Sequence, residues 1–411
     1  MSALPLSDVR VLDLTRLLPG GFCSLLLADL GAEVLKVEDT GMGDYIRWAP
    51  PYYGGDEQQA LGTRSSLYLS LNRGKRSVRL DLKNEAGKEA LLRLVAGYDI
   101  VLDGFRPGVL DKLGVGYERL REANPGIVYC AITGYGQDGP YAQRAGHDMN
   151  YLGLVGLLGL TGAKDGPPVQ SAGQIADLGG GGLMAAFGVM TALHERRRSG
   201  EGQMVDISMA DGALSWLAMV AGRYFCDEEV PRRGEQQLAG GLICYLPYEA
   251  SDGWISCGAL EPKFWAAFCN GVDRPDLVER QFEAPGSEAW QEVAAVFRSR
   301  SRDEWLAFND EHDCCIEPVL DLDEALDSDL VKAREMVVEL EQPELGTVRL
   351  LGNPVKLSRT PADTGRPAPA FGEHTDEVLR EAGYSEDEIA AMVESGAAAG
   401  PSATAQGEFR A

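Results

Sequence analysis

The chain has 411 residues, more than one hydrophobic core usually organises, and this length predicts two domains or one domain with a large insertion. Hydrophobic residues make up 45% of it and charged residues 25%, as in ordinary globular proteins, and no apolar run is long enough to suggest a membrane span. Because 63 acidic residues stand against 38 basic ones, the net charge of −25 argues against nucleic acid and membrane as partners.

The N-terminal segment and the cysteines point to the same compartment. MSALPLSDVRVLDL has no basic stretch followed by an apolar core and a small-residue cleavage site, so we expect no secretory signal. The eight cysteines are scattered and form no CxxC pair, as expected of buried thiols in a reducing environment. Both features predict a cytoplasmic protein.

The first elements predict an α/β fold with a Rossmann-like order. A strand over Val9–Leu14 leads through the glycines of TRLLPGG into a helix that ends near Gly31, and a second strand follows over Val34–Val37. The dinucleotide fingerprint GxGxxG is missing from this first turn. The spacing occurs later, at GYGQDG, but a proline and no amphipathic helix follows it, so we predict no nicotinamide cofactor.

A basic segment comes next in an otherwise acidic chain. Its charges lie close together in NRGKRSVRLDLK, at Arg73, Lys75, Arg76, Arg79 and Lys83. Gly104 and Arg106 follow the next predicted strand, Ile100–Leu102, at the end where α/β folds bind ligands. Any one of these side chains could belong to a solvated face, but the cluster together with Arg106 predicts a phosphate site.

The stretch from Gly146 to Gly182 carries the strongest catalytic signal. His147 and Asp177 lie in it among small and apolar residues. Such surroundings can tune the pKa values of an imidazole and a carboxyl toward one another, which is what proton transfer to and from carbon requires. Each residue also has a structural interpretation, His147 as a hydrogen-bonded structural residue and Asp177 as a helix N-cap above a glycine-rich turn.

The second half of the chain predicts a smaller α+β domain. A helix over Ala185–Leu193 and a strand over Met204–Ser208 come first, the composition then changes sharply, and CYLPYEASDGWISCGAL is typical of a β-hairpin. We therefore predict a large Rossmann-like domain over 1–221 to which 330–394 returns, a linker over 222–239, a small domain over 240–329 and a disordered tail over 395–411.

Blocks of sequence along nearly the whole chain resemble family III CoA-transferases, the CaiB/BaiF fold, and within them the α-methylacyl-CoA racemase branch. These blocks are PLSDVRVLDLTRLLPG, LLADLGAEVLKVE, NRGKRSVRLDLK, GFRPGV, GYGQDGP, GHDMNY, ADLGGGG, GALEPKFW and GEHTDEVL, in the family's order. The resemblance implies a homodimer of two interlocked, ring-like subunits, with the active site where the large domain of one subunit meets the small domain of the other.

The resemblance also implies residue roles. A carboxylate in the position of Asp177 is the nucleophile in the transferases and one of two acid/base groups in the racemases, so His147 is the residue that discriminates between the two. Glu261 in GALEPKFW matches a racemase carboxylate that hydrogen-bonds the catalytic histidine, reaching it from the partner subunit. From the residues alone, Glu261 before Pro262 is equally a first-turn helix residue.

The predicted function is epimerisation of 2-methylacyl-CoA thioesters by an isomerase of lipid metabolism. Two groups on opposite faces of a planar enolate would remove and return the α proton, with a backbone N–H near Asp148 or in Gly179–Gly182 holding the enolate oxygen. CoA is part of the substrate, and no metal or other cofactor is predicted. The alternatives are CoA transfer through a mixed anhydride on Asp177, and binding of CoA thioesters without catalysis.

One position departs from the racemase pattern. Many racemases carry an arginine just after the second strand to hold the CoA adenine and phosphates, whereas here Val37 is followed by Glu38, Asp39 and Thr40. A replacement charge could come from one of four nearby cations, Lys36, Arg73, Lys75 or Lys83, and Arg106 is the predicted phosphate contact.

Overall fold

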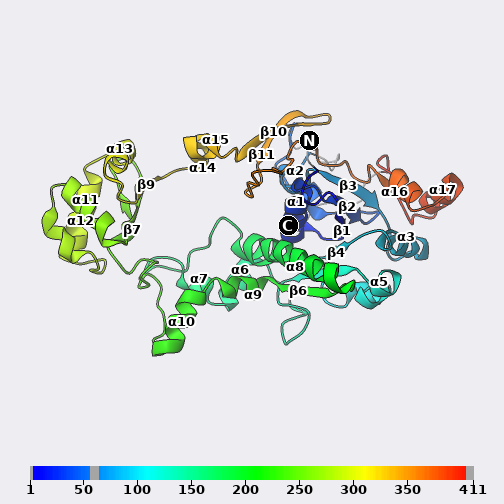
Figure 1. Ribbon diagram of the computed structural model, residues 1–411, viewed down its shortest axis with the longest axis horizontal. Coiled ribbons are helices and arrows are strands. Elements are labelled where there is room, and N and C mark those ends of the chain that lie inside the picture. Colours follow the sequence, from blue (N-terminus) through cyan, green and yellow to red (C-terminus); the bar gives the residue numbers. More distant parts are fainter. Residues whose placement is uncertain (1–2, 56–63, 404–411) are drawn as a thin grey trace. The chain divides into compact units, whose positions relative to one another are not determined.

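The computed structural model describes residues 3–55 and 64–403, which form two compact units (Figure 1). The first unit takes the residues up to Val155, then Ala172–Ser215, then those from Ala333 onward. The second takes Gly156–Ser171 and Trp216–Lys332. The large unit is therefore built from both ends of the chain.

A six-stranded parallel sheet organises the first unit. Its strands are β1 (Arg10–Asp13), β2 (Glu33–Glu38), β3 (Lys75–Arg79), β4 (Ile100–Asp103), β5 (Val128–Thr133) and β6 (Met204–Ser208). They are ordered β3-β2-β1-β4-β5-β6, with every neighbouring pair parallel. The order reverses between β1 and β4, and parallel sheets bind ligands at the carboxyl ends of the strands beside such a reversal. This confirms the predicted α/β fold.

Helices cover both faces of this sheet, because its strands are apolar on both sides (Figure 1). On one face the sheet packs against α1 (Leu17–Asp29) and α8 (Met184–Ser199). On the other it packs against α3 (Glu85–Val95), α5 (Tyr117–Ala123), α16 (Thr375–Glu381) and α17 (Glu386–Glu394). The shorter elements of the unit are η1 (Tyr45–Trp48), α2 (Ser66–Asn72), α4 (Val109–Leu113), α6 (Asp148–Leu154) and α9 (Met209–Ser215).

The C-terminal part of the chain returns to this unit. β10 (Val337–Gln342) and β11 (Gly346–Leu351) form an antiparallel hairpin whose apolar side chains pack with those of α1 and α2. Further on, Ala398 makes a β-bridge with Leu80 and is 1% exposed. The predicted disordered tail is therefore wrong for residues 395–403, because they are packed beside β3; residues 404–411 lie outside the described part of the chain.

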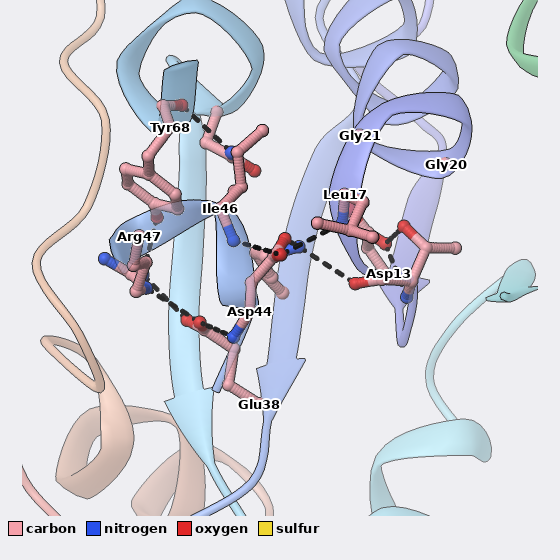
Figure 2. A network of polar contacts seen from close by, with 12 residues as sticks. Asp13, Leu17, Gly20, Gly21, Glu38, Asp44, Ile46, Arg47 and Tyr68 are labelled. Carbon is pink, nitrogen blue, oxygen red and sulfur yellow. Dashed lines mark hydrogen bonds and ion pairs between the residues drawn. The ribbon is translucent and has the colours of Figure 1, made fainter. Parts of the chain in front are cut away.

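Buried ion pairs link β2 to the segment that follows it (Figure 2). Arg47 donates two hydrogen bonds of 2.7 Å to Glu38, and Lys36 lies 2.8 Å from Asp44. Burial alone would raise the pKa of Glu38, but the Arg47 guanidinium outweighs it and holds that pKa at about 2. Glu38 is therefore an ionised structural group inside the unit.

The second unit has an antiparallel sheet and an aromatic core. Its strands are ordered β7-β8-β9, with β7 (Tyr245–Glu249) and β8 (Trp254–Gly258) forming the predicted hairpin and β9 (Ile316–Val319) at the edge. Trp265, Phe268, Phe297 and Trp305 are fully buried, with the rings of Phe268 and Phe297 stacked at 5.1 Å. The helical elements of this region are α7 (Leu157–Leu160), α10 (Ala218–Asp227), α11 (Pro262–Gly271), η4 (Pro275–Arg280), α12 (Glu288–Arg298), α13 (Arg302–His312), α14 (Leu322–Asp327) and α15 (Asp329–Ala333).

The predicted linker over 222–239 is ordered. Its first residues belong to α10, which ends at Asp227. The guanidinium of Arg233 then donates hydrogen bonds to the carbonyl oxygens of Gly159, Ala163 and Gly166, at 3.0, 3.2 and 2.6 Å. These bonds tie the segment to residues 156–171, which the predicted boundaries place in the large domain but which belong to the second unit.

All eight cysteines are free thiols, and six of them are buried as predicted, whereas Cys226 is exposed and Cys315 is half-buried. Among the described residues, one helical stretch, Ile175–Ser199, has the length and apolar composition of a membrane span. It is 44% buried inside the protein, and core helices of globular proteins share these properties.

Candidate active site

A cavity of about 420 Å³ opens at the carboxyl ends of β1, β4 and β5. Four residues predicted from the sequence line it: Gly104, Arg106, His147 and Asp177. We call it the acid–base cavity. His147 and Asp177 thus line the same cavity although they stand on different elements, while their catalytic role stays a prediction.

His147 is held at the start of α6 by its own sequence block. Its backbone N–H donates to Asn150 Oδ1 at 3.0 Å, which fixes the turn into the helix. Tyr151 donates to the carbonyl oxygen of Gly146 at 2.5 Å, and a Cβ on Gly146 would come within 2.6 Å of the Tyr151 ring. The imidazole is exposed at the cavity wall. The residues of GHDMNY therefore fix the backbone at His147 and leave its imidazole ring accessible.

Asp177 stands in the first turn of η3 (Ile175–Leu183), a π-helical segment that continues directly into α8. The backbone N–H groups of Ala176 and Asp177 donate to Asp148 Oδ1 at 2.6 and 3.0 Å. Gln174, the residue directly before η3, has a left-handed φ of 47°. Single π-helical turns are frequent at functional sites. Gly179–Gly182 is thus part of a helical segment, whereas the sequence suggests a glycine-rich turn.

The glycines of η3 are required by packing. A Cβ on Gly180 would lie 2.7 Å from the carbonyl oxygen of Met209 in α9, and a Cβ on Gly182 would lie 2.6 Å from that of Pro19 in α1. Neither backbone can move aside easily. The block ADLGGGG therefore lets three helices approach closely enough to hold Asp177 at the cavity.

The electrostatics of the cavity favour proton exchange near neutral pH. Burial and the charge of Asp148 raise the pKa of Asp177 to about 6, and His147 acts in the opposite direction. Asp148 is itself 1% exposed, and its Oδ2 accepts no hydrogen bond within the described residues. A carboxyl group with this pKa can both accept and return a proton under physiological conditions.

A second cavity, of about 590 Å³, lies at the ends of β1 and β2. We call it the lysine cavity because Lys83 and Lys112 line it, beside apolar side chains such as Leu80 and Val109. Lys83 was predicted from the sequence, whereas Arg16 and Lys112 were missed. Arg16 follows the first strand, so the rule that selected Arg106 would also have found it.

The structure contradicts the predicted ligand role of three other cations. Arg73 is 2% exposed and pairs with Asp29 at 2.7 Å. Lys75 is buried, and its Nζ donates to Ser24 Oγ at 2.7 Å and to Asp13 Oδ2 at 3.3 Å. Lys36 is fully buried in its pair with Asp44.

The remaining basic residues of that segment are also engaged. Arg76 pairs with Glu33, Glu377 and Glu381. The side chain of Arg79 donates to backbone carbonyl oxygens, including that of Thr40 at 2.5 Å. Apart from Lys83, the predicted phosphate cluster is thus a set of structural cations, which pair with acidic side chains or donate hydrogen bonds to carbonyl groups.

Glu261 lies in the second unit, directly before the proline that opens α11, and it is exposed. Its predicted role as the partner of His147 stays a prediction. Among the described residues, no three His, Cys, Asp or Glu side chains are grouped so that they could hold a metal ion.

Comparison with known proteins identifies the family. The model of CoA-transferase family III matches residues 6–375, nearly the whole chain. The chain belongs to this family. The resemblance seen in the sequence blocks is therefore confirmed at the level of the family.

Relatives with two kinds of activity are equally similar to the chain. It is 36% identical over 397 residues to alpha-methylacyl-CoA racemase of Mus musculus, covering 93% of this chain and 95% of that protein. It is also 36% identical over 388 residues to succinyl-CoA:mesaconate CoA-transferase of Haloarcula marismortui, covering 92% and 96%. The comparison therefore establishes an enzyme of the racemase and CoA-transferase superfamily.

Solved structures of the family share the fold. A CaiB/BaiF family protein from Brucella suis superposes with a TM-score of 0.80 at 29% identity, covering 93% of this chain and all of that one. The protein Rv3272 from Mycobacterium tuberculosis superposes with a TM-score of 0.78 at 28% identity, covering 92% and 100%.

Proposed function

We propose that this family member epimerises 2-methylacyl-CoA thioesters. The observation that carries the proposal is that His147 and Asp177 line one cavity, where burial and a neighbouring carboxylate raise the pKa of Asp177 to about 6. An imidazole and a carboxyl group with a pKa near neutrality suit the removal of a proton from carbon and its return from the other side.

The proposed reaction proceeds in two proton transfers. Asp177 or His147, depending on the epimer, removes the α proton, and the electron pair of the C–H bond passes into the thioester carbonyl to form an enolate. The other group then donates its proton to the α carbon from the opposite face. The enolate oxygen would be held by the backbone N–H of Asp148, which begins α6, where helical N–H groups have no partner within the helix.

The CoA portion would extend from the acid–base cavity into the lysine cavity. Arg106 lines the first and Lys83 the second, and both side chains are exposed. Cations at these positions suit the phosphates of CoA in a chain with a net charge of −25. CoA belongs to the substrate in this proposal, and the chemistry uses no metal or separate cofactor.

The protein would act as a homodimer, with Glu261 of one subunit orienting His147 of the other. Large apolar side chains on helices support an interface: Phe187 of α8 is 70% exposed, and Met219 and Phe225 of α10 are 68% and 77% exposed. A carboxylate that accepts a hydrogen bond from one ring nitrogen fixes the tautomer and raises the basicity of the other.

Incubation of pure (2R)- and (2S)-methylacyl-CoA in deuterium oxide tests the proposal. The wild-type protein should exchange the α proton of both epimers and convert each to the same mixture. His147→Ala and Asp177→Asn should each reduce interconversion by at least about 100-fold, the usual contribution of a positioned acid or base. No exchange with any member of a broad substrate panel would contradict epimerisation.

A second candidate is CoA transfer between an acyl-CoA and a carboxylic acid. The equal similarity to a succinyl-CoA:mesaconate CoA-transferase favours it. Here the Asp177 carboxylate would attack the thioester carbonyl, and CoA would leave as the thiolate to give an aspartyl mixed anhydride. Hydroxylamine would trap that anhydride in the wild type and not in Asp177→Asn, whereas an epimerase forms no such adduct.

A further inference from the structure

The acid–base cavity and the lysine cavity meet at Arg16. This residue, together with Phe105, lines both of them. It was not predicted from the sequence, and none of the roles proposed above uses it. A cation at this junction faces any ligand that occupies the two cavities at once.

The side chain of Arg16 makes weak, partly exposed contacts that a ligand could replace. Its guanidinium lies 2.6 Å from Asp39 and donates to the Tyr45 hydroxyl at 2.9 Å, with the Tyr45 and Phe105 rings at 4.9 and 5.3 Å. The two charged side chains are 28% and 37% exposed, so their ion pair contributes little net stability. Replacing Asp39 by another anion at Arg16 therefore requires little free energy.

Asp39 does not depend on Arg16 for its position. Its Oδ1 accepts hydrogen bonds from the backbone N–H groups of Gly41 and Gly43 at 2.8 and 3.1 Å, while its Oδ2 faces Arg16. The carboxylate would thus keep its backbone contacts after the guanidinium has turned away.

The backbone on both sides of Arg16 is fixed, in contrast to its side chain. Leu17 has a left-handed φ of 62°, which strains a residue with a Cβ, and its N–H donates to Asp44 Oδ1 at 3.0 Å (Figure 2). On the other side, Lys36 Nζ donates to the carbonyl oxygen of Thr15 at 3.0 Å. The buried Lys36–Asp44 pair therefore holds Arg16 at the junction from two directions.

We propose that Arg16 binds the diphosphate of CoA at the junction of the two cavities, exchanging Asp39 for the ligand. The inference rests on the proposed CoA-thioester chemistry. With the thioester beside His147 and the nucleotide in the lysine cavity, the diphosphate is the anionic segment that passes Arg16. A guanidinium can bind a phosphate through two parallel hydrogen bonds, whereas Arg16 donates a single one to Asp39 Oδ2, at 2.6 Å.

Calorimetric titration of the full-length protein with CoA and with dephospho-CoA, which keeps the diphosphate, tests the inference. Arg16→Gln should weaken both ligands by about ten-fold or more, as expected for a lost charge-assisted contact. Arg16→Lys should fall between the wild type and Arg16→Gln. Asp39→Asn keeps the Oδ1 acceptor but removes the competing charge, so it should tighten binding by about two- to five-fold, the strength of an exposed ion pair. When Asp39→Asn is added to Arg16→Gln, the affinity for CoA should not change further.

Arg93→Gln is the matched control, because Arg93 pairs with Glu89 at 3.2 Å and lies 4.2 Å from the Tyr384 ring but lines neither cavity. The Arg93→Gln protein should bind CoA with the affinity of the wild type. Unchanged binding by folded Arg16→Gln, or a loss in Asp39→Asn as large as in Arg16→Gln, overturns the inference and leaves the proposed function standing. A wild-type protein that binds no CoA overturns both.

Discussion

At the scale of single residues, Asp148 sets the properties of Asp177 by two routes. Its Oδ1 holds the backbone N–H of Asp177, and its charge helps burial to raise the pKa of that carboxyl to about 6. Asp177 must be ionised to accept a proton, so for one epimer the exchange rate should fall as the pH drops through about 6. Asp148→Asn keeps an Oδ1 acceptor and removes the charge, so this fall should move to lower pH.

The measurement is the pH dependence of α-proton exchange for each epimer. Asp165→Asn, a change at an exposed carboxylate in the second unit, serves as the control and should leave the profile unchanged. An Asp148→Asn profile that coincides with that of the wild type would show that Asp148 acts only through the backbone.

The raised pKa of Asp177 makes the stability of the folded protein depend on pH. Asp177 is harder to ionise in the folded protein than in the unfolded chain, so the folded state loses stability as the pH rises from about 3.8 to about 6. Asp177→Asn removes this penalty. Its unfolding midpoint in urea should therefore exceed that of the wild type at pH 8, and by less at pH 5. A lower midpoint at pH 8 would mean that the carboxylate stabilises the fold.

At the scale of elements, the close approach of η3 to α9 limits which residues the site tolerates. A Cβ at Gly180 would meet the Met209 carbonyl oxygen at 2.7 Å and the Ala213 nitrogen at 2.9 Å. Gly180→Ala should therefore destabilise the protein by about 1–3 kcal/mol, as overpacking does, and lower activity by displacing Asp177. Urea unfolding and the exchange assay report the two effects.

Gly222 provides the control for that change. It lies within α10, and a Cβ there would meet nothing within 4 Å. Because alanine is the better helix former, Gly222→Ala should leave stability unchanged or raise it. Equal losses in both variants would show that the close contact of η3 with α9 is not what makes Gly180 necessary.

At the scale of the whole molecule, the proposed dimer predicts complementation between subunits. If Glu261 serves His147 of the other subunit, a mixed dimer of His147→Ala and Glu261→Ala chains contains one intact site. Equal mixing after dissociation should then restore about a quarter of the wild-type activity, since half of the dimers are mixed and each has one of two sites intact. No activity in mixed dimers would place Glu261 and His147 in one subunit, and full activity of Glu261→Ala dimers by themselves would remove Glu261 from the site.

Much of this architecture can be read from the sequence by itself. Alternation of apolar strands and helices predicts a parallel sheet, and such sheets gather the carboxyl ends of their strands at one edge. That rule led to Arg106, which in the structure lines a cavity together with Gly104 and His147. The block ADLGGGG also marks the segment of Asp177, although its π-helical form depends on α1 and α9 and could not be predicted locally.

Only the tertiary structure decided which charges a ligand can reach. Arg73 is neutralised by Asp29, 44 residues away, and Lys75 by Asp13, 62 residues away, so two cations of the basic segment form buried ion pairs. Arg16 stays accessible because its partner Asp39 lies at the cavity rim. Likewise, Ala398 is ordered by its pairing with Leu80, at the opposite end of the chain. The sequence shows which residues are charged. Whether a ligand can bind them depends on the oppositely charged residues that folding brings close from distant segments.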